Sequence, residues 1–404
     1  MANVTQLKHL EHLEDEMLNY GVEGCKSIVS FLKELRKMLG CDNSTGYMQT
    51  KWDGLPAIVY GYHPQIKAFF IANKSAFNKE TQKCAFNEKG VDKYYGHAPD
   101  MANKLKACLK YFPKLGIKGI VQGDFIASKS DIKTETVHGE KLYTFGNQAI
   151  TYGIPVDHEI GQRVSQAEVI VVLHTHYVGD DIKTIQAKGG LGQERLNDVK
   201  EVAVINNDTP MHKVGLNHAE EIKFDKMVAA IESDCKISGE FLDELVKETG
   251  KTGDKKWHVA SYLKQYINSQ VKEKKSISNV DTYFKGLYNF YYDKTKPLLD
   301  KIVTPKTHRQ KTALVQSSLR YLEDNQDKWK TMLSLYRNIQ DLKQMVIDKL
   351  DHLETFRTFA RSDKGYEVTG PEGYVLHKDG DMVKLVNRLE FSYINFTLAK
   401  QWRQ

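Results

Sequence analysis

Apolar side chains recur every three or four residues over two N-terminal stretches, which is the pattern of amphipathic helices. In residues 4–20 these positions are Leu7, Leu10, Leu13, Met17 and Leu18, and in the second stretch they are Ile28, Phe31, Leu32, Leu35, Met38 and Leu39. Gly21 lies between the two stretches. The sequence therefore predicts a pair of helices with a break near Gly21.

From about Gly46 the pattern changes to short β-rich runs separated by turn residues. Ala57–Tyr62 and Lys67–Asn73 flank His63-Pro64-Gln65, which predicts a hairpin. Met101–Phe112 has helical spacing, and strand-like runs resume at 119–127, 141–145, 149–155 and 168–177. Most connections are too short for crossover helices, so these runs predict mixed, mainly antiparallel sheets.

Beyond about Asn207 the β pattern stops, and long helical patterns continue to about Phe359. The longest covers 329–356, where apolar residues step by three or four. Strand-like runs return at Gly373–His377 and Met382–Val386, joined by a turn at 378–381. The aromatic-rich segment 391–402 is expected to pack back on the core.

Together these patterns predict an α+β protein. The expected parts are an N-terminal helical pair at 1–45, a core in two pieces at 46–206 and 361–404, and a large helical domain at 207–360 inserted between the pieces.

Composition narrows the class of protein. With 404 residues, 41% hydrophobic and 27% charged, the chain has ordinary globular usage, which speaks against wholesale disorder. Its five cysteines form no CxxC pair, which speaks against a zinc ribbon or a disulfide scaffold. The N-terminus lacks the apolar core of a signal peptide, and no run approaches the about 18 apolar residues that span a bilayer. We expect a soluble cytoplasmic protein.

The net charge of +6 fits a polyanionic partner but does not require one. Two basic stretches in the helical region, 272–275 and 306–311, offer contacts to phosphates. Solvated helix faces are the alternative interpretation of both stretches.

Candidate chemistry centres on Lys51-Trp52-Asp53-Gly54, the KWDG segment. A lysine on a β-like run, followed by an acid and a turn glycine, suits an amine that acts as a nucleophile beside bound phosphates. With a pKa near ~10.4, only about one lysine in a few thousand is uncharged at neutral pH. The hypothesis therefore requires that burial, a metal ion or a nearby cation depress the pKa of Lys51. The alternative is that Asp53-Gly54 is a plain turn.

The KWDG segment resembles the KxDG nucleophile motif of the covalent nucleotidyltransferase superfamily, which includes ATP-dependent DNA and RNA ligases and capping enzymes. Further segments resemble the later motifs of that superfamily and occur in the same order. They are Phe70-Ile71-Ala72-Asn73-Lys74-Ser75, Val121-Gln122-Gly123-Asp124-Phe125-Ile126, Val169 to Tyr177, Glu372-Gly373-Tyr374-Val375-Leu376 and Met382-Val383-Lys384-Leu385. Single matches of this kind are weak, but an ordered series is stronger. The resemblance implies a ligase-like nucleotidyltransferase core.

The resemblance also implies roles for individual residues. Lys51 would be the nucleophile and Lys384 the α-phosphate clamp, while Glu372 would be the metal-linked carboxylate. Lys74 and Asp124 would hold the ribose side of ATP. Asp53 would orient the nucleophile's surroundings, and His174 or Tyr177 would stack on the base. Mg²⁺ would be the metal. For Lys74 and Lys384 the alternative is a surface strand lysine. A metal pair of His174 and His176 is a further alternative.

Several departures bear on the subclass. Leu55-Pro56 replaces the arginine that DNA ligases place after the glycine, and Val386 stands where the last motif normally has a second lysine. The stretch after Val386 is too short for the OB-fold domain that DNA ligases and capping enzymes append. These departures favour an RNA-ligase-like enzyme over a DNA ligase.

Most of the chain also resembles uncharacterised proteins of tailed phages, which share Leu10-Glu11-His12-Leu13-Glu14-Asp15 and the KWDG segment. That resemblance implies expression in an infected bacterial cytoplasm. The leading hypothesis is a polynucleotide ligase that acts on RNA ends. A DNA ligase, nucleotidyl transfer to another acceptor, and a catalytically degenerate nucleic-acid-binding protein remain alternatives.

Overall fold

The computed structural model describes residues 11–40, 44–146, 150–205, 208–209, 211, 214–351, 357–362, 365–368, 371–379 and 381–392. The described residues divide into two compact units. Unit 1 holds those of 47–210 and 351–382, and unit 2 holds those of 11–46, 211–350 and 383–404. Each unit is therefore assembled from segments that are far apart in sequence.

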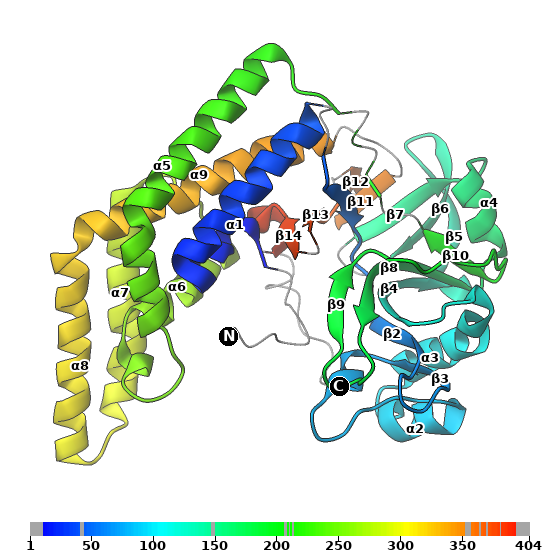
Figure 1. Cartoon of the computed structure of the whole chain (residues 1–404), viewed down its shortest axis with the longest axis horizontal. Helices are drawn as coiled ribbons and strands as arrows, with labels where there is room; N and C mark the ends of the chain where they lie inside the picture. The colour runs from blue at the N-terminus through cyan, green and yellow to red at the C-terminus, as the bar shows by residue number, and fades with distance from the viewer. Residues whose placement is uncertain are drawn as a thin grey trace. The chain divides into compact units, whose positions relative to one another are not determined.

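The largest sheet of unit 1 has the strand order β10-β8-β4-β2-β3, with β9 also paired to β8. In chain order these strands are β2 (Ala57–Tyr62), β3 (Phe69–Ala72), β4 (Ile120–Ser128), β8 (Val169–Val178), β9 (Gln186–Gly189) and β10 (Val202–Ile205). Neighbouring strands are antiparallel except β10 and β8, which are parallel. Two helices, α2 (Glu88–Tyr95) and α3 (Pro99–Tyr111), lie beside this sheet (Figure 1). Their buried side chains, such as Leu105, pack with Val121 and Val171 in one apolar core.

Two smaller sheets complete unit 1. One has the order β12-β11-β7-β6-β5, formed by β5 (Lys133–Val137), β6 (Glu140–Gly146), β7 (Ile150–Pro155), β11 (Arg357–Ser362) and β12 (Gly365–Val368). Helix α4 (Glu159–Gln166) follows β7. The other sheet has the order β1-β13-β14, formed by β1 (Tyr47–Lys51), β13 (Gly373–Lys378) and β14 (Asp381–Leu385). The boundary between the units falls within β14.

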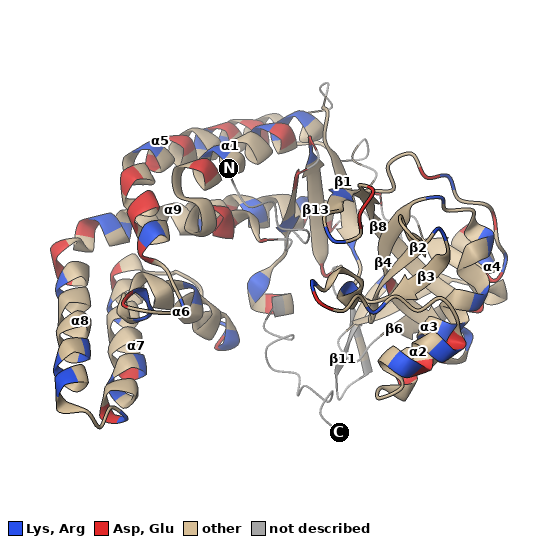
Figure 2. Cartoon of the chain, turned by 60° about the horizontal axis from the view of Figure 1, so that its bottom comes forward, with Lys and Arg blue, Asp and Glu red and all other residues tan. Residues whose placement is uncertain are grey.

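Unit 2 is helical. Its main helices are α1 (Glu16–Leu39), α5 (His218–Glu248), α6 (Ala260–Lys272), α7 (Val280–Asp300), α8 (Pro305–Asp324) and α9 (Gln326–Leu350). Short turns of helix, η1 (Leu13–Asp15) and η7 (Arg388–Ser392), lie near the two ends of the described chain. Lys and Arg occur together with Asp and Glu on α5 and α7, whereas the acidic residues of α8 lie at its C-terminal end (Figure 2). Both signs of charge are therefore present on these helices.

A buried polar cluster ties unit 2 together. Lys343 Nζ donates to both carboxylate oxygens of Glu14, at 2.6 and 2.7 Å. Beside this pair, Arg388 donates to Asp15 at 3.1 Å and to the Tyr336 hydroxyl at 2.7 Å. Breaking such a cluster by removing one member would leave a buried charge uncompensated.

The fold confirms the predicted α+β class and the largely antiparallel sheets. The hairpin of β2 and β3 forms with Val59 opposite Ala72, as the alternating pattern predicts. The long helix expected at 329–356 is α9, which ends at Leu350; residues 352–356 lie outside the described part of the chain. Of the segment 391–402, which we expected to pack on the core, only 391 and 392 are described, and Phe391 is buried.

Two domain boundaries differ from the prediction. Strand β11 begins at Arg357, inside the range 207–360 that was expected to be helical. The N-terminal helices, expected as a separate part at 1–45, pack as α1 against α5 within unit 2. Short elements such as α2 and α4 were not predicted, and none of the described helices is long and apolar enough to cross a membrane.

Gly21 interrupts α1 as the sequence predicts. Its backbone lies at φ 58° and ψ −127°, a region that only glycine adopts readily. A β-carbon at this position would lie 1.9 Å from Asp243 Oδ1, the atom that accepts a hydrogen bond from the Val22 amide. The break in the helix is therefore fixed both by backbone conformation and by a close contact with α5.

We expect Gly21→Ala to lower the free energy of unfolding by roughly 2–4 kcal/mol, because it adds backbone strain to an overpacked contact. Thermal and denaturant unfolding followed by circular dichroism measure the change. Gly215→Ala is the matched control, since a β-carbon there would meet nothing within 4 Å. Equal stability of the Gly21→Ala protein and the wild type would contradict the described conformation.

Candidate active site

The antiparallel ladder between β1 and β13 places a lysine beside a glutamate. Lys51 is the last residue of β1 and is paired with Gly373, the first residue of β13. Glu372 directly precedes β13, and its carboxylate accepts a hydrogen bond from Lys51 Nζ. Their side chains are 25% and 9% exposed, so the ion pair is largely removed from solvent.

The charges around Lys51 have the opposite effect to the one that the nucleophile hypothesis requires. Burial alone would lower the pKa of Lys51, as expected, but Glu372, Asp124 and Asp53 together raise the pKa above its usual value. Burial in turn raises the pKa of Glu372, and Asp53 and Asp124 add to this effect against the opposing Lys51. Without a ligand, Lys51 is therefore an ammonium group held by carboxylates.

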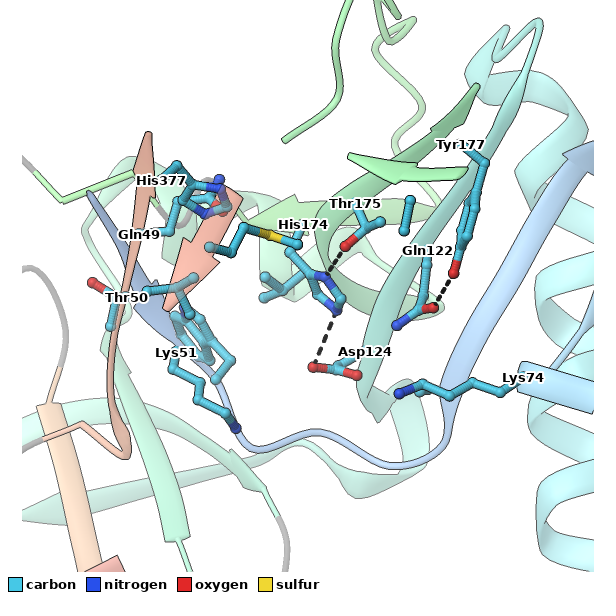
Figure 3. Close-up of a pocket in the computed structure, with 16 residues that line it drawn as sticks. Gln49, Thr50, Lys51, Lys74, Gln122, Asp124, His174, Thr175, Tyr177 and His377 are labelled. Carbon is cyan, nitrogen blue, oxygen red and sulfur yellow. Dashed lines mark hydrogen bonds and ion pairs between the residues drawn. The ribbon is translucent and has the colours of Figure 1, made fainter. Parts of the chain in front are cut away.

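Several of the predicted site residues line one cavity of about 220 Å³. Lys51 reaches it from β1, Asp124 from β4, His174 from β8, and Lys74 from η2 (Lys74–Phe77), the short helix that follows β3 (Figure 3). The cavity therefore collects charged side chains from strands that are far apart in sequence. The sheet order accounts for Asp124 and His174, because β4 and β8 are adjacent.

Polar side chains on β4 and β8 form a short network in the cavity. His174 Nε2 lies 3.6 Å from Asp124 Oδ2, and His174 Nδ1 lies 2.8 Å from Thr175 Oγ1. The Tyr177 hydroxyl donates to Gln122 Oε1 at 2.6 Å. Both candidates for the base-stacking position, His174 and Tyr177, therefore line the cavity and are oriented by neighbours.

The tryptophan and glycine of the KWDG segment anchor it to the sheets. Trp52 is 2% exposed, and its ring packs on Tyr152 with centroids 4.3 Å apart. The Asp53 amide donates to the Tyr152 hydroxyl at 2.7 Å. At Gly54 a β-carbon would lie 2.6 Å from the Phe125 carbonyl oxygen. The glycine is therefore required by close backbone approach, and the segment is more than a plain turn.

His377 lines the same cavity and was not predicted. It pairs with Tyr47 in the β1–β13 ladder, and the two rings stack with centroids 4.3 Å apart and 5° between their planes. Burial, together with the nearby His174, lowers the pKa of His377 to about 4. The period of two along β13 was the available signal, since it places His377 on the same face as Val375, another residue of the cavity.

Lys384 is the one predicted site residue that belongs to unit 2. It lies on β14, and its main-chain amide donates to the Glu11 carbonyl at 3.0 Å. It is not among the residues that line the cavity. The structure therefore brings Lys51, Lys74, Asp124 and His174 to one cavity, with Glu372 and Asp53 close to Lys51. Lys384 is not part of this group.

The carboxylates around Lys51 suit a hard divalent cation that is shared with a phosphate ligand. Among the described residues, no group of three or more His, Cys, Asp or Glu side chains forms a site for a metal. Mg²⁺ needs no such group, because it is commonly bound by one or two carboxylates, substrate phosphates and water. Glu372, which is buried beside Asp53 and Asp124, fits that mode of binding. His174 and His176 have separate partners, since His176 Nδ1 contacts the Gly190 carbonyl at 3.0 Å.

Comparison with known proteins places the chain in a family. A sequence profile described as a family of unknown function, DUF6267, matches residues 3–400. The chain belongs to DUF6267. Searches with this DUF6267 chain against curated proteins and against solved structures gave no match.

We expect Glu372→Gln in the DUF6267 protein to lower the pKa of Lys51, because the lowering by burial would then exceed the raising by Asp53 and Asp124. A lower pKa means more uncharged amine at a given pH, so Lys51 should be acetylated faster across a pH series. Peptide mass spectrometry measures the rate at each lysine in one sample.

Asp281→Asn is the control for the loss of one carboxylate. Asp281 pairs with Lys330 at 2.5 Å on the surface of unit 2, so its removal should leave Lys51 unchanged. Slow acetylation of Lys51 in Glu372→Gln, equal to that in the wild type, would show that Glu372 does not hold the amine in its charged form.

Proposed function

We propose that this protein is a covalent nucleotidyltransferase that carries a nucleotide on Lys51, and that it acts as an ATP-dependent ligase of polynucleotide ends. The observation that carries the proposal is the grouping of Lys51, Asp124 and Lys74 around one cavity, with Glu372 paired to Lys51. A fixed amine, carboxylates able to share a cation with phosphates, and a second lysine are the groups that phosphate chemistry needs. The ordered motifs of the sequence, except that of Lys384, name the same residues.

The first step would be attack of the uncharged Lys51 Nζ on the α-phosphorus of ATP. A phosphorus–nitrogen bond forms, the bond from the α-phosphorus to the bridging oxygen breaks, and pyrophosphate leaves with the bond's electron pair. Once bonded to phosphorus, the nitrogen carries a positive charge, and it loses one proton to solvent or to a neighbouring carboxylate. In the ligand-free protein, Glu372 is the carboxylate in hydrogen-bond contact with Nζ.

Lys51 must first be released from its charged form. Phosphate binding in the cavity would bring negative charge toward Lys74, and a cation bound to the phosphates would draw Glu372 away from the amine. Mg²⁺, when bound by Glu372 and the phosphates, would offset the carboxylate charge and stabilise charge that develops on the phosphate oxygens. Burial of Lys51 would then favour the uncharged amine.

In the following steps a polynucleotide 5′-phosphate would attack the lysyl-AMP, breaking the phosphorus–nitrogen bond and forming a diphosphate bridge. A 3′-hydroxyl would then displace AMP and leave a phosphodiester. The net charge of +6 favours such a polyanionic substrate. The basic stretch 272–275 lies where α6 ends, and the stretch 306–311 lies in the first turns of α8. Within them, Lys275 forms an ion pair with Glu273, and Lys311 forms one with Asp254. The preference for RNA rests on the sequence departures alone.

Incubation with α-labelled ATP and magnesium should label the protein covalently. The label should be released by acid, as expected of a phosphorus–nitrogen bond, and pyrophosphate should reverse it. Lys51→Ala and Lys51→Arg should abolish labelling, because neither leaves a nucleophilic amine at this position. Lys330→Ala, which removes a surface lysine of unit 2, is the matched control and should label normally.

The labelled protein should then transfer its AMP to a 5′-phosphorylated RNA and seal it to a 3′-hydroxyl end. Labelling by GTP in place of ATP would instead favour transfer to another acceptor, such as an RNA cap. Absence of labelling with every nucleoside triphosphate would overturn the catalytic proposal. RNA binding that persists in such a protein would identify it as a binding module.

A further inference from the structure

His377 and Tyr47 form a stacked pair that is held in place by two consecutive glycines. A β-carbon on Gly189 would lie 2.1 Å from His377 Nδ1, and a β-carbon on Gly190 would lie 2.6 Å from the Tyr47 hydroxyl. Gly190 also has a φ of 70°, which favours glycine, and its amide donates to the His174 carbonyl at 2.8 Å. The turn after β9 is therefore shaped to receive the two rings.

The His377 ring is buried without a hydrogen bond. Its exposed fraction is 3%, and within the described part of the chain neither ring nitrogen has a partner. A neutral imidazole carries one donor and one acceptor, and leaving both unused in the interior costs stability. Almost all buried polar groups are satisfied, so an exception that lines a cavity points to a ligand.

The position of His377 along β13 indicates which part of a ligand it meets. Gly373 pairs with Lys51 and His377 pairs with Tyr47. Four residues of strand, at ~3.3 Å per residue, separate the lysine end from the His377 end by about 13 Å. Met382 lies beside His377, since both are close to Gly189, and Val375 lies two residues before His377 on β13. Lys51 is at the opposite end of the β1–β13 ladder, and all four residues line the cavity.

This separation of charged and apolar ends matches the polarity of a nucleotide, which has phosphates at one end and a flat heteroaromatic base at the other. We propose that His377 recognises the base of the bound nucleotide through a hydrogen bond from its ring. Because Nδ1 faces Gly189, Nε2 is the nitrogen that meets the base. The inference rests on the proposed function for the identity of the ligand, but it concerns binding and not covalent transfer.

Isothermal titration of the full-length protein with ATP and with inorganic triphosphate tests this role. His377→Phe keeps a ring that can stack on Tyr47 but removes both nitrogens. We expect the affinity for ATP to fall about tenfold, the size of one hydrogen bond, and the affinity for inorganic triphosphate to stay unchanged. Gly189→Ala should act in the same way by displacing the ring, and Gly215→Ala is its matched control, since a β-carbon there has open space.

Unchanged ATP affinity in folded His377→Phe would overturn the assignment. An equal loss of affinity for ATP and for inorganic triphosphate would also overturn it, because it would indicate a general change of the cavity. If His377→Phe does not fold, Gly189→Ala and His377→Gln decide the question by the same comparison. The labelling of Lys51 is a separate readout. Base-dependent binding through His377 in a protein that never becomes labelled would refute the proposed transfer and leave this inference standing.

Discussion

The ion pair of Lys51 and Glu372 joins two strands of unit 1 that lie 321 residues apart in sequence. Neither charge is well solvated, so each depends on the other for compensation. Their contact requires that β1 and β13 align with Lys51 opposite Gly373, and a shift of one residue would turn the side chains to the opposite face. This pairing fixes both the register of the sheet and the position of the candidate nucleophile.

A second buried lysine shows that the surrounding charges decide the direction in which the pKa of such a lysine shifts. Lys343 in unit 2 is also paired with a glutamate, Glu14, at 2.6 Å. Burial lowers the pKa of Lys343, and Arg388 nearby adds to that effect against Glu14. The pKa of Lys51 is raised by Glu372 together with Asp124 and Asp53, and no cation contributes to its shift. The pKa of the lysine is therefore raised in one pair and lowered in the other.

Sequence patterns predicted the elements in which apolar periodicity was strong. The β2–β3 hairpin and α9 followed from their periods of two and of three to four residues, and the break at Gly21 followed from the gap between two apolar runs. Helix α2, with the sequence EKGVDKYY, has too few apolar residues to give a period. Strand β10 was missed because four residues are too short to distinguish a strand from other buried segments.

The candidate site was predictable only in part, for a physical reason. The order of motifs pointed to Lys51, Asp124 and Glu372, which do meet around one cavity or in direct contact. Neither the pKa of Lys51 nor the burial of His377 could be predicted in this way, because both depend on residues that converge from separate strands. A histidine on a strand has no sequence signal that distinguishes a satisfied core residue from an unsatisfied one.

The resting charge of Lys51 has a consequence for any chemistry at this site. Carboxylates that hold the amine as an ammonium group keep it from reacting with adventitious electrophiles. The same carboxylates are the groups that would bind a cation carried by a triphosphate, so binding of the ligand would also release the amine. A nucleophile arranged in this way becomes reactive only when its substrate is present. Under the proposed function, Glu372 would both hold Lys51 as an ammonium group and, by binding the cation, release it.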